Sequence, residues 1–162
     1  MSLVFDASTL ILLAKTTLLR DVTKLTQVQI PTVVEEECLA KSSFDAALIK
    51  QLIQERRITV QKEVAESGFK KLMEDFRIGS GEASALLLAR TKELPLAIDD
   101  GQAIKVCKVL GLHFVTAIHI LLLLVSSGRL SKEIATEKLE ELSHIGRYTK
   151  KIVEDAAQRL KE

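Results

Sequence analysis

Short apolar segments alternate with segments of helical periodicity along most of this chain, and this alternation constrains the fold more than any other feature. Apolar strands joined by helices are typical of βαβ units, in which a parallel sheet is covered by helices on both faces. The pattern therefore predicts an α/β fold with a central parallel sheet of four to five strands. The expected strands are Leu3–Phe5, Gln29–Pro31, Ile58–Val60, Leu94–Ile98 and His113–Val115.

Apolar residues at helical spacing, together with Pro, Gly, Ser and Thr at the ends, predict the intervening helices. No repeat, linker or low-complexity segment divides the chain, so residues 1–162 are expected to form one domain, with a helical extension over about residues 130–162. The expected helices are one around Leu10–Ala14, one from Thr32, Phe44–Glu55, Glu63–Phe76, Glu82–Arg90, Gln102–Leu110, one from Thr116 to Gly128, Ser131–Leu142 and Tyr148–Leu160.

Composition excludes several function classes. Aromatic residues make up 4% of the chain, which is too few for a stacking platform for single-stranded nucleic acid. The net charge is +1, whereas a chain that binds nucleic acid or anionic membrane over its whole surface would be strongly basic. Two distant cysteines argue against a disulfide framework or a zinc site and fit a reducing compartment. The longest apolar run, Phe114–Val125, is shorter than the roughly 20 residues of a membrane span. With no signal peptide visible, we expect a cytoplasmic protein with no membrane association.

Carboxylates follow two of the expected strands directly. Asp6 comes after the first strand, and Asp99 and Asp100 come after the fourth. Parallel sheets bind ligands at the carboxyl ends of their strands, which makes these acids candidates for catalysis. Asp is also a favoured helix N-cap, so capping is an equally good interpretation of each acid taken singly.

Three consecutive glutamates follow Pro31, and helix geometry separates them. Thr32 with Glu35 has the spacing of a capping box, which gives Glu35 a structural role. Glu37 falls on the same apolar helix face as the valines before it, whereas Glu36 projects elsewhere. A carboxylate on an apolar face is costly unless a cation satisfies it. We therefore favour Glu37 over Glu36 as the functional acid and assign Glu36 a supporting role.

Glu82 begins the most apolar helix of the chain and shares a face with Ala85, Leu86 and Ala89. Converging carboxylates repel one another by about 4 kcal/mol per pair at 4 Å and an effective dielectric of 20. A divalent cation removes this cost, and oxygen ligands favour Mg²⁺ or Mn²⁺. Such a cation activates water and stabilises a phosphoryl transition state, so metal-assisted phosphodiester hydrolysis is the expected reaction class.

Other polar residues have weaker signals. Thr116 is either a helix cap or a support for the site, and His119 is predicted to be a core or interface residue. The apolar stretch Leu121–Val125 is explained equally well by core burial and by a dimer interface. Basic residues near the acids could contact phosphates, although a solvated helix face explains their pattern better. These candidate nucleic-acid-binding residues are Lys105, Lys108, Arg147, Lys150 and Lys151.

In order and spacing, these motifs resemble the PIN-domain family and its PIN-like branch of small prokaryotic proteins described as nucleic-acid-binding. The resemblance spans nearly the whole chain. The matching segments are Val4-Phe5-Asp6-Ala7-Ser8, Ile30-Pro31 with Glu36-Glu37, Gly81-Glu82-Ala83-Ser84-Ala85, Leu96-Ala97-Ile98-Asp99-Asp100, Gly111 to Thr116, Leu139-Glu140-Glu141-Leu142 and Gly146-Arg147-Tyr148.

The resemblance implies an α/β/α sandwich and an Mg²⁺- or Mn²⁺-dependent ribonuclease, often the toxin of a VapBC toxin–antitoxin pair and frequently a homodimer. It implies an RNA substrate and an antitoxin partner. It also implies that Ser8, in the turn after Asp6, helps to hold the Asp6 side chain in place. One departure is that residues 101–105 contain no carboxylate, whereas many active PIN domains have an Asp there. The resemblance implies five catalytic acids, which are Asp6, Glu37, Glu82, Asp99 and Asp100. All of these except Glu37 are expected to bind the metal directly.

Three functions therefore remain open. The first is a metal-dependent ribonuclease. The second is a catalytically weak or inactive PIN-like module that binds nucleic acid or a protein. The third is a protein-binding role in which the two C-terminal helices dock a partner.

Overall fold

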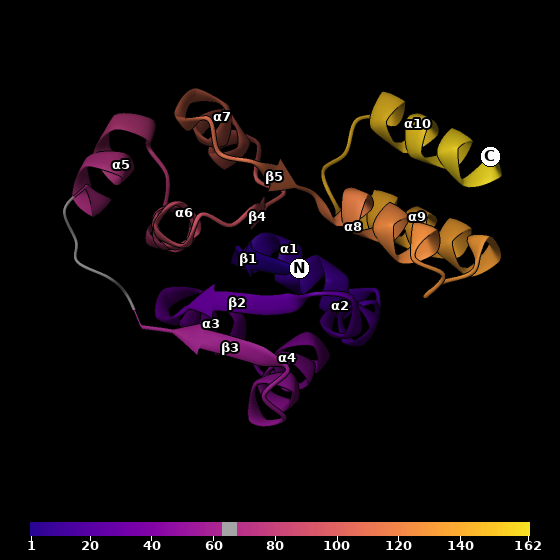
Figure 1. Cartoon of the computed structure of the whole chain (residues 1–162), viewed down its shortest axis with the longest axis horizontal. Coiled ribbons are helices and arrows are strands. Elements are labelled where there is room, and N and C mark those ends of the chain that lie inside the picture. Colours follow the sequence, from indigo (N-terminus) through magenta and orange to yellow (C-terminus); the bar gives the residue numbers. More distant parts are fainter. Residues whose placement is uncertain (63–67) are drawn as a thin grey trace.

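Five short strands form one parallel sheet in the computed structural model, which describes residues 1–62 and 68–162 (Figure 1). Their order across the sheet is β3-β2-β1-β4-β5. The predicted α/β class and parallel sheet are confirmed. The strands are β1 (Ser2–Phe5), β2 (Gln27–Pro31), β3 (Ile58–Gln61), β4 (Leu96–Ala97) and β5 (Phe114–Val115).

β1 is the central strand, and the chain leaves it first toward β2 and much later returns beside it as β4. Phe5 of β1 lies opposite Ala97 of β4, so the two strands end side by side. Open α/β sheets bind their ligands at such a reversal of strand order, beyond the carboxyl ends of the strands, which here are those of β1 and β4. Asp6 and Asp99 follow these two strands within two residues.

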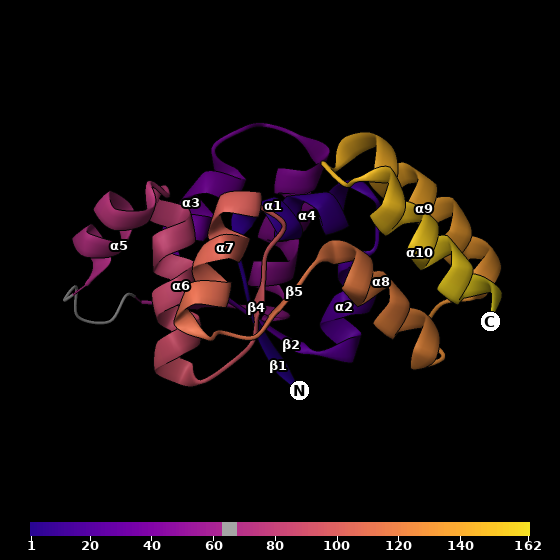
Figure 2. The ribbon, with the colours of Figure 1, turned by 90° about the horizontal axis from the view of Figure 1, so that it is seen from above.

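Helices cover both faces of the sheet and confirm the predicted three-layer sandwich. Figure 2 shows α5, α6 and α7 on one side of the strands and α2, α8, α9 and α10 on the other. The described residues form α1 (Ala7–Lys15), α2 (Leu19–Leu25), α3 (Thr32–Leu39), α4 (Phe44–Gln54), α5 (Phe69–Phe76), α6 (Ser80–Lys92), α7 (Gly101–Leu110), α8 (Ala117–Ser126), α9 (Lys132–Ile145) and α10 (Lys150–Lys161).

Three elements differ from the sequence prediction. The short helix α2 has no counterpart there, because its seven residues hold only three apolar side chains, too few for the period to stand out. Of the predicted helix Glu63–Phe76, residues 63–67 lie outside the described residues and α5 occupies the remainder. α10 begins at Lys150 because the Thr149 side chain accepts the Ile152 N–H as its N-cap, which leaves Tyr148 in the preceding loop.

The two C-terminal helices pack on each other and on α8, beside the sheet (Figure 1). Their apolar residues join the same hydrophobic core as the strands. A single domain over residues 1–162 stays a prediction. Leu121 is fully buried and Leu123 is 38% exposed, so α8 serves the core on one face and leaves apolar surface on the other. No described helix has the length and hydrophobicity needed to span a membrane.

Candidate active site

Asp6 is a buried carboxylate at the end of the central strand, and it caps α1. Its Oδ2 accepts hydrogen bonds from the Ser8 hydroxyl at 2.9 Å and the Ser8 N–H at 3.4 Å. The residue is 2% exposed. Burial raises the pKa of Asp6 to about 6, the Ser8 hydroxyl opposes this shift, and the charge of Glu82 adds to it. Ser8 thus supports Asp6 as the resemblance implies, and Asp6 and Glu82 interact electrostatically.

Glu37 of α3 and Glu82 of α6 form the second part of the site, because α3 packs against α6. The Glu37 carboxylate accepts a hydrogen bond from the Gly81 N–H at the start of α6. Partial burial, and then the charge of Glu82, raise the pKa of Glu37. Glu37 is exposed as a residue, so the prediction that it points into an apolar interior is wrong. Its carboxylate instead lies over the N-terminus of the neighbouring helix.

The buried thiol of Cys38 follows Glu37 in α3. Its pKa is raised to about 12 by burial, and the charges of Asp6, Glu37 and Asp45 contribute to that shift. The high pKa keeps Cys38 a neutral thiol, which argues against a nucleophilic role for it.

The predicted capping box at Thr32 and Glu35 is wrong. α3 has Pro31 as its N-cap and no side-chain cap, and Thr32 is already helical because β2 continues to Pro31. The Thr32 hydroxyl donates to the Gln61 carbonyl at 3.4 Å instead. Glu36 is exposed, in agreement with the prediction that it projects away from the apolar face.

Asp99 is held by donors from three separate parts of the chain. It accepts hydrogen bonds from the Thr9 hydroxyl at 2.6 Å, the Ala117 N–H at 3.1 Å and the Tyr148 hydroxyl at 2.5 Å. Burial raises its pKa, and these hydrogen bonds lower it. Asp100 caps α7 by accepting the Ala103 N–H at 3.0 Å, so the capping interpretation fits Asp100.

Sequence reasoning missed Thr9 and Tyr148. Thr9 lies one helical turn after Asp6 and points to the same end of the sheet, a spacing that could have flagged it. Tyr148 is 49 residues from Asp99, and no local pattern connects the two. The ring of Tyr148 packs over Gly146, where an added Cβ would lie 2.8 Å from Cδ2 of that ring.

Thr116 is the helix cap of α8 and forms a capping box with His119. The Thr116 hydroxyl accepts the His119 N–H, and His119 Nδ1 accepts the Thr116 N–H. His119 is exposed, so a core position is wrong for it, and an interface position stays a prediction. Its first-turn capping role keeps the ring at the surface.

Three of the five predicted cations line one cleft next to Asp99. Lys108, Arg147 and Lys151 belong to it, and Lys150 instead lies 3.8 Å from Glu154 in a surface ion pair. Lys105 is exposed on α7. Helix periodicity alone could not separate Lys150 from Lys151, because it did not show which side of α10 faces the cleft.

The carboxylates thus divide into a coupled group, which we call the acidic triad (Asp6, Glu37 and Glu82), and a separately held Asp99. Among the described residues, no ion pair involves any of these four acids. No three His, Cys, Asp or Glu side chains of the described residues converge closely enough to hold a metal by themselves. Mg²⁺ commonly uses one or two carboxylates and completes its shell with water, so the donor chemistry of the triad fits such an ion.

Gly81→Ala is expected to disturb the site without unfolding the protein. The new methyl group would lie 2.7 Å from Cδ of Glu37, so this flexible carboxylate must leave its place over α6. Ala gains about 1 kcal/mol over Gly in a helix, which offsets the lost hydrogen bond. We expect urea unfolding to change by less than about 1 kcal/mol and Mn²⁺ affinity to fall as far as in Glu37→Gln. Unchanged Mn²⁺ affinity in Gly81→Ala would show that the position of Glu37 does not matter.

A family model described as a PIN domain matches residues 2–162, nearly the entire chain. No curated protein and no solved structure matches this chain significantly. The match agrees with the parallel five-stranded sheet and with acids placed at its switch point. The chain belongs to the PIN-domain family.

Proposed function

We propose that this protein is a metal-dependent endoribonuclease. PIN domains are generally nucleases, and their nucleases typically use divalent metals. The observation that carries the proposal is the acidic triad at the switch point of the sheet, where the charge of Glu82 raises the pKa values of both Asp6 and Glu37. Among the described residues, no ion pair neutralises any of the three acids. A site with this excess of negative charge favours a cation over an anionic substrate, so the cation is needed before a phosphodiester can approach.

Asp6 and Glu82 are the residues that would hold Mg²⁺ or Mn²⁺, through carboxylate oxygens, and Glu37 adds negative charge beside them. The bound cation would activate a water and stabilise the negative charge of the transition state. Ser8 fixes the orientation of Asp6 by donating to Oδ2. Gly81 does the same for Glu37 through its N–H.

Asp99 lies where the substrate would meet the site and helps to orient it. Its carboxylate is held in one orientation by donors from α1, α8 and the loop before α10, so it does not need to reorganise when substrate binds. From this place Asp99 can accept a hydrogen bond from water or a ribose hydroxyl. Asp100 contributes by capping α7 and so fixing the backbone next to Asp99.

The test is RNA cleavage by the full chain. We expect single-stranded and structured RNA to be cleaved internally with Mn²⁺ or Mg²⁺, and cleavage to stop with chelator and in Asp6→Asn. Asp75→Asn is the matched control, because it removes the same charge from an exposed position on α5. Cleavage that persists in Asp6→Asn, or that ignores chelator, would contradict the proposal.

A non-catalytic PIN-like module is the second candidate, favoured by the hydrogen bonds that occupy Asp99 and Asp100 and by the lack of an acid at residues 101–105. It predicts RNA binding without turnover. Calorimetric titration separates the two functions, since no Mn²⁺ binding at millimolar metal would favour the module. A toxin role, an antitoxin partner, a homodimer and docking of a partner by α9 and α10 stay predictions.

A further inference from the structure

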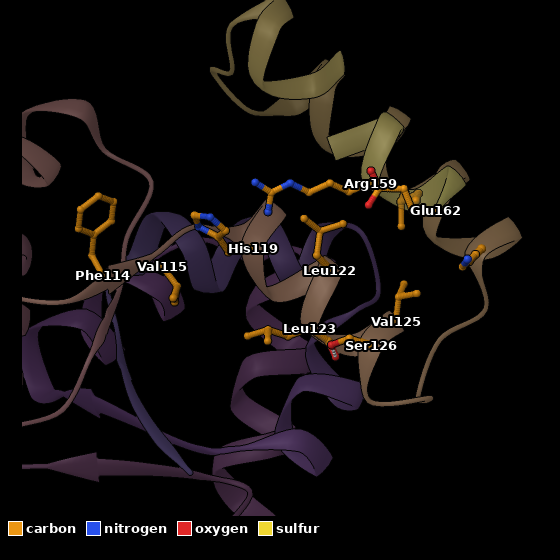
Figure 3. Close-up of a pocket in the computed structure, with 11 residues that line it drawn as sticks. Phe114, Val115, His119, Leu122, Leu123, Val125, Ser126, Arg159 and Glu162 are labelled. Atoms are coloured by element: carbon orange, nitrogen blue, oxygen red, sulfur yellow. Dashed lines mark hydrogen bonds between the residues drawn. The ribbon is translucent and has the colours of Figure 1, made fainter. Parts of the chain in front are cut away.

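An open cleft of about 710 Å³ begins at Asp99 and Asp100 and extends between α7, α8 and α10. A second pocket, of about 760 Å³, shares Phe114, His119, Leu122 and Arg159 with it and continues along α8. Figure 3 shows this continuation, with Arg159 extending from α10 toward His119 and with Leu122 and Leu123 on α8. These volumes are in the range of small-ligand sites.

Apolar side chains from three elements form the walls of the cleft. Phe114 of the edge strand β5 and Leu122 of α8 are half-buried, and Ile152 of α10 is 48% exposed. Apolar surface that gathers in a concave site indicates a ligand with an apolar face. One aromatic ring and two aliphatic side chains suit a single planar group, whereas a run of stacked bases needs a longer platform.

The cations of the cleft favour an anionic ligand. Lys108, Arg147 and Lys151 approach it from α7, from the loop before α10 and from α10 itself, and none of them is in an ion pair with another described residue. Arg159 is compensated by Asp155, which lies 3.3 Å from its Nε. On the acidic side, Asp99 and Asp100 already accept hydrogen bonds from the protein. Four cations (Lys108, Arg147, Lys151 and Arg159) and three carboxylates (Asp99, Asp100 and Asp155) line the cleft, so its formal charge is +1.

We propose that this cleft binds one nucleotide of a single-stranded RNA, with the base against Phe114, Leu122 and Ile152 and the phosphate at Lys108, Arg147 and Lys151. A planar apolar group joined to a phosphate matches both the walls and the charge. The cleft opens at Asp99, so a strand whose scissile phosphate lies at the acidic triad would carry a neighbouring nucleotide into it. The proposal rests on the proposed function for this placement, and it deepens that function by naming where the strand is held.

The experiment measures binding of a labelled single-stranded RNA to the full chain in chelator, with the RNA checked for integrity afterwards. Lys151→Glu is compared with Lys150→Glu, which makes the same charge change one residue away and outside the cleft. We expect Lys151→Glu to weaken binding about tenfold more than Lys150→Glu. We also expect it to reduce the magnitude of the salt slope, log K against log salt, by about 0.7 for one lost phosphate contact.

Ile152→Ser and Ile134→Ser test the apolar wall. Both isoleucines are exposed to a similar degree, 48% and 46%, but Ile134 lies on α9 and lines neither pocket. We expect RNA affinity to fall about fivefold in Ile152→Ser and less than about twofold in Ile134→Ser. Equal effects within both pairs of variants would overturn the proposal.

The nucleotide in the cleft could belong to an RNA strand or be a free nucleotide, and a parallel titration with a free nucleoside 5′-monophosphate separates these two sources. Cleft variants that weaken only the free nucleotide, and not the RNA, would overturn the assignment to a strand. The chelator keeps this test independent of catalysis. If the cleft variants lose RNA binding and no condition gives cleavage, the nuclease proposal fails and the binding site in the cleft stands. If RNA is cleaved and the cleft variants bind it normally, the binding site in the cleft fails and the nuclease proposal stands.

Discussion

Asp6→Asn is expected to make the protein more stable at neutral pH in the presence of chelator. The folded pKa of Asp6, about 6, lies above its ordinary value of 3.8. Between these two pH values the folded state holds a proton that the unfolded chain releases, so the free energy of unfolding falls as pH rises from about 4 to about 6. By pH 7 the loss reaches about 3 kcal/mol. Asn keeps an acceptor for Ser8 and has no charge to bury.

Urea unfolding of wild type and Asp6→Asn, followed by circular dichroism between pH 4 and pH 8 in chelator, measures this difference. We expect similar stabilities at pH 4 and a gap of about 1–3 kcal/mol in favour of the variant at pH 7 to 8. Mn²⁺ should raise the stability of wild type and leave the variant unchanged, because a ligand stabilises only the state that binds it. Asp75→Asn, an exposed acid, is the control and should follow wild type at every pH. A gap of constant size from pH 4 to pH 8 would show that burial of the Asp6 charge is not its cause.

Tyr148→Phe is expected to cost about 1.5–3 kcal/mol of stability, the range for a hydrogen bond to a charged group. The Tyr148 hydroxyl lies 2.5 Å from Asp99 Oδ1, and both side chains are half-buried. The lost donor leaves this oxygen with only the longer bond from the Ala117 N–H, at 3.3 Å. We further expect RNA cleavage to fall in kcat while KM changes little, because Asp99 loses its fixed orientation. Urea unfolding and single-turnover cleavage measure the two effects.

The double variant Tyr148→Phe with Asp99→Asn tests whether the cost belongs to this pair. If it does, the sum of the stability losses of the two single variants will exceed the loss of the double variant by at least about 1 kcal/mol, which is the coupling energy of the pair. Gly146→Ala should show the same loss of kcat together with a loss of stability, since its methyl group would displace the Tyr148 ring and would also lie 2.8 Å from the backbone carbonyl oxygen of Leu142. Additive costs in the cycle would mean that Tyr148 stabilises the loop only through packing of its ring.

Local chemistry determines the sheet of this protein and the edge of it that carries acids. Short apolar segments are enough to locate part of each strand, because strands of a covered parallel sheet are rich in apolar residues. The polar residues Gln27 and Thr59 are exposed within β2 and β3. Parallel strands end at a common edge, so the sequence predicts Asp6 and Asp99 beside each other, and they do follow neighbouring strands. The helix-capping alternative for Asp100 is also visible in the sequence, since capping depends on residues within three positions.

The tertiary structure alone decided the partners of these acids. The assignment of Glu35 to a capping box failed because a three-residue spacing cannot show where β2 stops and α3 begins. Glu37 is placed by Gly81, and Asp99 by Tyr148, in contacts between segments that are far apart along the chain. Sequence patterns report the periodicity of one segment, whereas the pKa of a carboxylate depends on burial and charge contributed by several. The sequence by itself therefore determined the sheet and the end of it that carries acids, and packing between distant elements decided which acids are coupled, because burial and charge act through space.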